Sequence, residues 1–305
     1  MSRSPAKRVL SLWIAFAATL APALARAQAC CAGGSAVTPG RLEPHEWALV
    51  GIQLRAGDVF GSYEPGGRYV ASPSADSEFD LEQDLFGAVR VLGRGQVALL
   101  VPLLETLRAT PQDGSHFGGG IGDVNLGARY DFVLAGQSQY VPGIALLGGA
   151  TFPTGTAVES STAPLAVDTT GIGAFQGNVA LALEQTFGPW LVNATGMLAA
   201  RTPRFGETLA PQGTLLGAGA YTFPNDAAAV LALSYAFEGD ATRSNGTAIV
   251  GSAKRLTTAT ASVLWPLSDA WRLVGGLFLN PPFSSFGASQ VATGGLTITV
   301  IRSWS

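Results

Sequence analysis

Apolar and polar residues alternate along much of the chain, most clearly between Ile121 and Phe132. A period of two is the pattern of a β-strand with one apolar and one polar face. The polar positions of this segment include charged residues, which cost several kcal/mol in a soluble core unless they are paired. A water-filled lumen accepts them at little cost. The pattern therefore predicts a strand with one face in lipid and the other in a lumen.

The alternation recurs down the chain and predicts an all-β protein, a transmembrane antiparallel β-barrel of about twelve strands. Most of these segments are longer than the about nine to eleven residues that a tilted strand needs to cross a bilayer. The expected strands cover residues 46–57, 78–92, 95–108, 120–134, 139–152, 171–187, 190–202, 211–223, 227–238, 254–267, 270–281 and 289–304.

Short and long connections alternate between these strands. The short ones are rich in turn-forming residues, as in Pro224-Asn225-Asp226, and the long ones are rich in Gly, Ser, Thr and Pro. Outer-membrane barrels have this asymmetry, with tight periplasmic turns and longer external loops. We therefore expect residues 46–305 to form the barrel with both termini in the periplasm. A soluble β-sandwich is the alternative, but it gives no reason for strict alternation. The long connections are expected at 58–77, 109–119, 153–170, 203–210, 239–253 and 282–288.

Aromatic residues gather where the expected strands end at short turns. Phe187 and Trp190 flank one turn, and Trp265 and Trp271 flank another. Such a distribution is typical of an interfacial girdle, whereas core aromatics would be spread along the strands. The last expected strand alternates apolar residues and ends near Trp304, as assembly of such barrels usually requires.

The N-terminus has the features of a cleavable export signal. Positive residues precede the apolar stretch 9–24, and Ala25-Arg26-Ala27 supplies a small-x-small cleavage pattern. We expect residues 1–27 to be removed during export and residues 28–45 to form a periplasmic segment that carries Cys30 and Cys31. The expected location is the outer membrane, with its lipid and its assembly machinery as partners.

Composition and charge exclude two further classes of protein, those that span a membrane with helices and those that bind nucleic acid. Only 13% of the residues are charged, and no stretch after the signal has eighteen uninterrupted apolar residues. Removing the four positive charges of the signal takes the net charge from −3 to −7. Nucleic-acid binding depends on basic surfaces, so we expect no nucleic-acid partner.

Two short motifs resemble a known family. Gly120-Ile121-Gly122-Asp123-Val124-Asn125-Leu126-Gly127-Ala128-Arg129-Tyr130 and Phe152-Pro153-Thr154-Gly155-Thr156 resemble consecutive segments of outer-membrane proteins grouped with the meta-pathway phenol-degradation transporters. The resemblance implies an outer-membrane channel for hydrophobic or aromatic compounds. It implies no binding residues, because the matching positions look architectural.

Candidate catalytic groups are sparse, and we expect no enzyme and no cofactor. His116 has Asp113 and Ser115 nearby in an expected loop, but adjacent loop residues rarely form a catalytic triad, and no G-x-S-x-G motif is present. Cys30 and Cys31 have only His45 as a nearby histidine, whereas a metal site needs three or four ligands. A vicinal disulfide, a bridge to a partner or a flexible tail explains the cysteine pair better.

Charged residues on the polar faces are the candidates for lining the lumen. They could form rings that select solutes, or they could pair across the lumen and fill it. The leading hypothesis is thus a passive channel for small, hydrophobic or aromatic solutes. The alternative is a structural or partner-binding barrel with a plugged lumen and a Cys-containing N-terminus. The lumen-lining candidates are Arg55, Glu82, Asp84, Arg90, Asp123, Arg129, Asp131, Glu184, Arg201 and Arg272.

Overall fold

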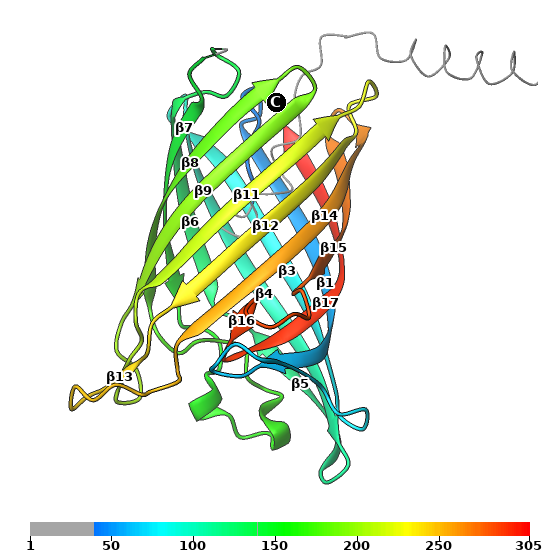
Figure 1. The fold of residues 1–305 in the computed structure, drawn as a ribbon. Coiled ribbons are helices and arrows are strands. Elements are labelled where there is room, and N and C mark those ends of the chain that lie inside the picture. Colours follow the sequence, from blue (N-terminus) through cyan, green and yellow to red (C-terminus); the bar gives the residue numbers. More distant parts are fainter. Residues whose placement is uncertain (1–39, 139) are drawn as a thin grey trace, which may run out of the picture.

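The computed structural model describes residues 40–138 and 140–305, and these form one closed antiparallel barrel (Figure 1). Within this part of the chain, twelve strands pair with their sequence neighbours, and the first pairs with the last. Closure leaves no unpaired strand edge, as a bilayer interior requires. The barrel strands are β1 (Ala48–Tyr63), β3 (Ser77–Val91), β4 (Gly95–Thr110), β6 (Val124–Val133), β7 (Gly143–Phe152), β8 (Gln176–Phe187), β9 (Trp190–Arg201), β11 (Gln212–Thr222), β12 (Ala228–Glu238), β14 (Lys254–Ser268), β15 (Trp271–Leu279) and β17 (Gln290–Trp304).

The connections fall into two sets at opposite ends of the barrel (Figure 1). One end carries the short turns, the C-terminal residues and the chain that leads into β1; we call it the short-turn end. The other, the long-loop end, carries the longer connections. These contain β2 (Tyr69–Ala71), β5 (Gly114–Ile121), β10 (Glu207–Thr208), β13 (Thr242–Arg243), β16 (Gly287–Ala288) and the 3₁₀ turns η1 (Val158–Ser160) and η2 (Pro164–Ala166).

Several strand boundaries differ from the sequence-based expectation; β6 begins at Val124 instead of 120, and β8 at Gln176 instead of 171. β1 runs to Tyr63 instead of residue 57, because its last residues pair with β17 and β2 across a bulge near Gly61. The expected loop 109–119 is wrong: β4 and β5 form a hairpin whose turn covers only 111–113. β7 begins at Gly143 instead of 139, and Pro142 just before it has no N–H to donate to a strand ladder.

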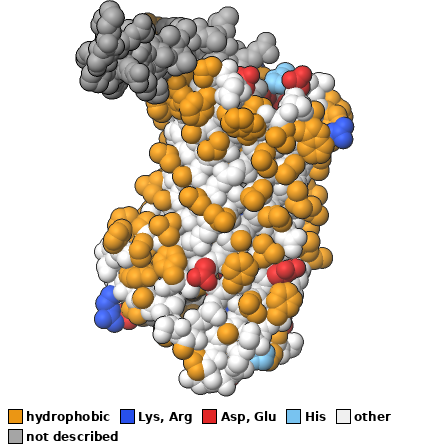
Figure 2. All heavy atoms as spheres, turned by 90° about the vertical axis from the view of Figure 1, so that its right-hand side faces the viewer, with side chains coloured by type: hydrophobic (Ala, Val, Ile, Leu, Met, Phe, Trp, Pro, Cys, Tyr) orange, Lys and Arg blue, Asp and Glu red, His pale blue; other side chains and the backbone are white. Residues whose placement is uncertain are grey.

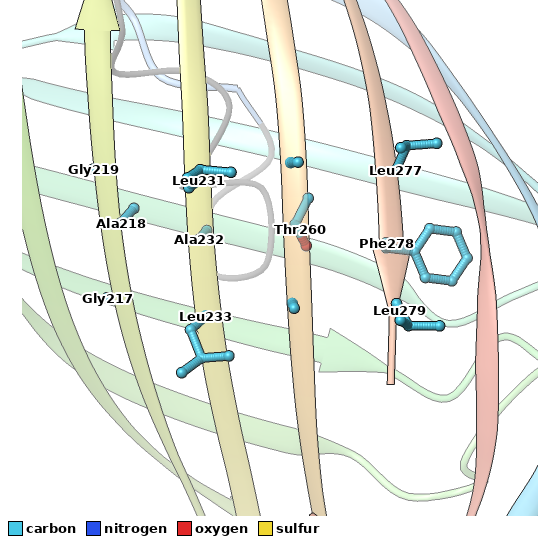
Figure 3. A pocket seen from close by; sticks show the side chains of 12 residues that line it. Gly217, Ala218, Gly219, Leu231, Ala232, Leu233, Thr260, Leu277, Phe278 and Leu279 are labelled. Atoms are coloured by element: carbon cyan, nitrogen blue, oxygen red, sulfur yellow. The ribbon is translucent and has the colours of Figure 1, made fainter. Parts of the chain in front are cut away.

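The outer wall is apolar, as expected for a surface that faces lipid. Hydrophobic side chains spread over the wall, and charged ones lie mainly toward the two ends (Figure 2). Along β15, Leu277 and Leu279 are 56% and 44% exposed, whereas Phe278 between them is 6% exposed and faces inward. Figure 3 shows these residues beside Leu231 and Leu233 of β12, across the small side chains of β14. Strand alternation therefore sets which side chains reach the lumen.

Aromatic side chains surround the short-turn end on the outside. Trp190 packs edge-on against Tyr221, with ring centroids 4.9 Å apart, and Tyr221 against Phe223 at 5.1 Å. Arg302 lies over the rings of Trp271 and Trp304, at 5.6 and 4.9 Å from their centroids. This arrangement matches an interfacial aromatic belt.

Candidate functional site

The chain that precedes β1 enters the lumen at the short-turn end. Residues 40–47 lie at the barrel mouth: Leu42, 4% exposed, packs with Leu49 and Phe86, whereas His45 and Trp47 are exposed. The Gln96 side chain holds this segment on both sides: it accepts a hydrogen bond from the Leu42 N–H (3.0 Å) and donates one to the Gly40 carbonyl (3.1 Å). We call residues 40–47 the inner segment.

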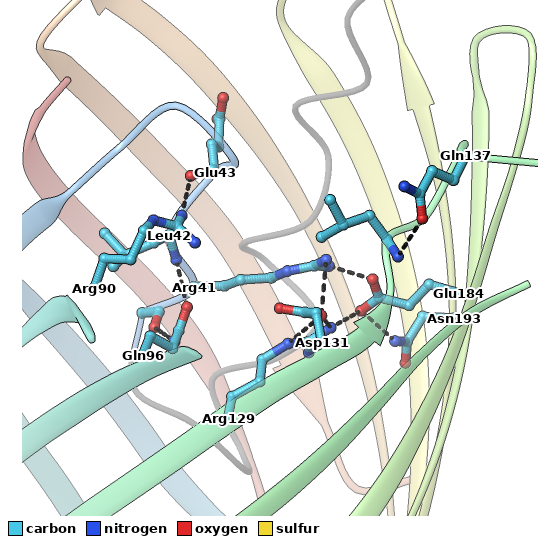
Figure 4. A network of polar contacts seen from close by, with 12 residues as sticks. Arg41, Leu42, Glu43, Arg90, Gln96, Arg129, Asp131, Gln137, Glu184 and Asn193 are labelled. Carbon is cyan, nitrogen blue, oxygen red and sulfur yellow. Dashed lines mark hydrogen bonds and ion pairs between the residues drawn. The ribbon is translucent and has the colours of Figure 1, made fainter. Parts of the chain in front are cut away.

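Arg41 of the inner segment joins a network of buried charges contributed by β6 and β8 (Figure 4). Its guanidinium lies 2.5 Å from a Glu184 carboxylate oxygen and 4.0 Å from Asp131. Arg129 contacts the same two carboxylates, at 2.8 Å from Asp131 and 3.2 Å from Glu184. Asn193 donates a further hydrogen bond to Glu184. The positive charges of two guanidinium groups are thus balanced by the negative charges of two carboxylates.

The acidic residues of the inner segment meet a second arginine from the wall. Arg272 of β15 lies 2.5 Å from Glu43 and 2.9 Å from Glu46. Arg90 of β3 donates hydrogen bonds to the backbone carbonyls of both glutamates. Arg272, Glu43 and Glu46 are all at least about nine-tenths buried. The inner segment is therefore held by opposite charges on two sides of the mouth.

Burial dominates the electrostatics of Glu43. Loss of solvent raises the pKa of the Glu43 carboxyl above its ordinary value of 4.5; Glu46 also raises it, whereas Arg272 and His45 act in the opposite direction. Removing one partner of a buried ion pair usually costs about 3–5 kcal/mol, because the other charge is left without compensation. Release of the inner segment would leave Arg272 and the wall carboxylate of Glu184 without their partners in that segment, so the ion pairs favour the docked segment.

A cavity of about 410 Å³ occupies the middle of the lumen. On one side, Arg55 lies 3.1 Å from Glu82 and 4.0 Å above the Phe278 ring, and the Asp84 carboxylate accepts a 3.3 Å hydrogen bond from Gln53. The opposite side is formed by alanine and hydroxyl side chains of β12 and β14. We call it the central cavity.

A second cavity, of about 420 Å³, lies beyond it at the long-loop end. Ser234 of β12 and Thr258 of β14 line the central cavity, and the next inward-facing residues on these strands, Ala236 and Leu256, line the second cavity. Arg201 lines it and forms a 2.6 Å ion pair with Glu238, both side chains being at least nine-tenths buried. We call this space the outer vestibule.

Asp123 lies outside the strands, between β5 and β6, and its role is to hold a loop. Its carboxylate accepts hydrogen bonds from the backbone N–H groups of Gly155 (2.9 Å) and Ile172 (2.7 Å). Thr154 donates to the Gly122 carbonyl at 2.7 Å. A Cβ on Gly155 would lie 2.8 Å from the Thr170 carbonyl oxygen, so only glycine fits. The two motifs of the family resemblance thus form a single joint.

The other candidates do not assemble into a catalytic or metal site. His116 contacts the backbone carbonyl of Asp113, whose carboxylate pairs instead with the Thr110 hydroxyl, so no relay links them. Within residues 40–138 and 140–305, no group of three or more His, Cys, Asp or Glu side chains is placed to hold a metal ion. The described part of the chain also has no helix long and apolar enough to cross a membrane. The expected signal 1–27 and the pair Cys30 and Cys31 lie outside the described residues.

Sequence reasoning did not identify the inner segment or the outer-vestibule partners. Residues 28–45 are expected to form a periplasmic segment, and the structure adds that Arg41 and Glu43 near its end provide countercharges to lumen residues. The signal available was the mixture of charges just before the first strand. Alternation along the strand places Glu238 on its polar face, but its pairing with Arg201 depends on strand register.

Comparison with known proteins supports the fold alone. No protein-family model matches the sequence, and no curated protein matches it. Among solved structures, the COG4313 outer membrane channel from Pseudomonas putida F1 has a TM-score of 0.69 at 14% identity, covering 87% of this chain and 100% of that one. The NanC porin has a TM-score of 0.49 at 9% identity, covering 83% of this chain and 100% of that one. The KdgM porin has a TM-score of 0.46 at 10% identity, covering 84% of this chain and 100% of that one. The chain thus has an outer-membrane β-barrel fold.

Proposed function

We propose that this protein is an outer-membrane channel for the passive passage of small solutes. The observation that carries the proposal is the sequence of two cavities along the lumen, the central cavity and the outer vestibule. The short turns and the inner segment would face the periplasm, and the long loops the exterior, as in other barrels of this kind. Passage would require displacement of the inner segment.

Hydrophobic or aromatic solutes are the class that we propose for this channel. The two motifs that resemble the meta-pathway phenol-degradation transporters support this class, and so does the lining of the central cavity. Phe86, Leu100 and Phe278 present apolar surface there, among hydroxyl and charged side chains that include Arg55 and Glu82.

The competing proposal is a structural or partner-binding barrel with a permanently plugged lumen. The ion pairs of the inner segment favour it, because they stabilise the closed mouth. The two proposals differ in one respect: a channel conducts once the inner segment moves, and a structural barrel does not.

Single-channel conductance of the full chain in planar bilayers separates them. The comparison is between the wild type, Arg272→Gln, and the control Arg94→Gln, which removes an exposed arginine from the same end of the barrel. We expect small or infrequent conductance steps in the wild type and the control, and larger or more frequent steps in Arg272→Gln. If Arg272→Gln migrates as a folded, heat-modifiable barrel but never conducts, the channel proposal is wrong.

A further inference from the structure

The outer vestibule has more positive than negative charge. Arg201, Arg204, Lys254 and Arg255 line it, against the single carboxylate of Glu238. Arg204 also pairs with Glu159 of the adjoining loop at 3.0 Å. Two cations are thus matched by two carboxylates, which leaves a net charge of +2 on the vestibule wall.

Two of the four cations of the vestibule, Lys254 and Arg255, have no carboxylate partner among the described residues. Within residues 40–138 and 140–305, the side chains of Lys254 and Arg255 form neither an ion pair nor a hydrogen bond, and both are exposed. Lys254 lies opposite Glu238 in the strand register and therefore shares its inward face, whereas Arg255 lies opposite Phe237 and shares the outward face. Oε2 of Glu238 is occupied by Arg201 at 2.6 Å. Lys254 thus remains available to an anion that enters the vestibule.

Apolar side chains form much of the remaining wall. Leu256 faces inward from β14, Leu209 is 8% exposed, and Val158 and Ile172 contribute from the loop that Asp123 holds in place. The volume of about 420 Å³ lies in the range of about 300–1,000 Å³ that is usual for small-molecule sites. A bare inorganic anion would leave these apolar surfaces unused.

We propose that the outer vestibule binds small amphipathic carboxylates, with the carboxylate at Lys254 and the apolar body against Leu209 and Leu256. The inference rests on the proposed channel function, since it names the solute class that the outer mouth would capture first. Excess positive charge with few nearby carboxylates concentrates anions, and it does so less as ionic strength rises.

Binding to the purified protein in neutral detergent tests this inference without any need for transport. Titration calorimetry would compare benzoate with benzyl alcohol, which lacks the charge, and with inorganic phosphate, which lacks the apolar body. We expect benzoate to bind saturably and more tightly than either. The variant Lys254→Gln should weaken benzoate binding by about tenfold, as expected for loss of a charge-assisted contact.

The matched control is Arg243→Gln, which removes an exposed charge in β13, outside the vestibule lining. It should leave benzoate affinity unchanged. Equal affinity for benzoate and benzyl alcohol, equal affinity for phosphate, or unchanged benzoate affinity in Lys254→Gln would each overturn the inference. Benzoate binding by a barrel that never conducts would refute the channel and keep the site, whereas conductance without benzoate binding would do the reverse.

Discussion

Four arginines and four carboxylates meet at the short-turn end of the described lumen, whereas the outer vestibule at the other end has four cations and two carboxylates within reach. The short-turn charges are mostly buried, and the unmatched cations of the vestibule are exposed. Charges removed from water need partners, because their desolvation is expensive, whereas hydrated charges can remain unpaired. The comparison teaches that balanced charge holds the inner segment at one end and that unbalanced charge is tolerated where water enters.

We expect the largest loss of stability when Glu184, at the short-turn end, is replaced. Glu184→Gln leaves Arg41 and Arg129 with only Asp131 to balance them, so the barrel should lose about 3–5 kcal/mol of stability. Glu238→Gln at the other end should cost less, about 1–3 kcal/mol, because Arg201 keeps Gln176 and Gln212 as acceptors. Urea unfolding in lipid vesicles measures both, and equal losses would contradict the comparison.

Arg272→Gln should release the inner segment. The substitution leaves Glu43 and Glu46 buried without their guanidinium partner, a change that usually costs about 2–5 kcal/mol. Cleavage by trypsin after Arg41, followed by mass spectrometry, should accelerate by at least about tenfold. Arg94→Gln serves as the control and should cleave at the wild-type rate; unchanged cleavage in Arg272→Gln would show that the ion pairs do not hold the segment.

Asp123→Ala should loosen the loop at the long-loop end without releasing the inner segment. It removes the acceptor of two backbone N–H groups, at Gly155 and Ile172, which is worth about 1–3 kcal/mol locally. Hydrogen exchange should increase at 153–172 and stay unchanged at Leu42. Faster exchange at Leu42 as well would mean that the two ends are coupled.

The smallest effect is expected in the pH dependence of the inner segment. Burial raises the pKa of Glu43 in the docked segment above the ordinary value of 4.5. Protonation of Glu43 therefore contributes to docking below pH 4.5, and this contribution is lost as the pH rises through the raised pKa. Exchange of the Leu42 amide, normalised to its intrinsic rate, should therefore increase across that range. Glu43→Gln should flatten the profile and His45→Asn should keep it; a profile that survives Glu43→Gln would assign it to another group.

Much of the fold could be predicted from the sequence, because strand alternation is a local property. The face of Arg129 follows from its neighbours Ala128 and Tyr130, whatever the rest of the chain does. Turn-forming residues such as Pro224-Asn225-Asp226 likewise mark the strand ends locally. The hairpin of β4 and β5 was missed because its glycines favour a loop, and pairing over eight residues outweighs that preference.

The partners of the lumen charges could not be predicted in the same way. Alternation says that Glu184 faces inward, but its contact with Arg41 joins residues 143 positions apart in the chain. Such a contact depends on barrel closure, on strand register and on the path of the inner segment, none of which leaves a local pattern. The sequence by itself thus determined the strands, their faces and the barrel class. Only the tertiary structure decided which charges neutralise one another, because ion pairing depends on distance in space.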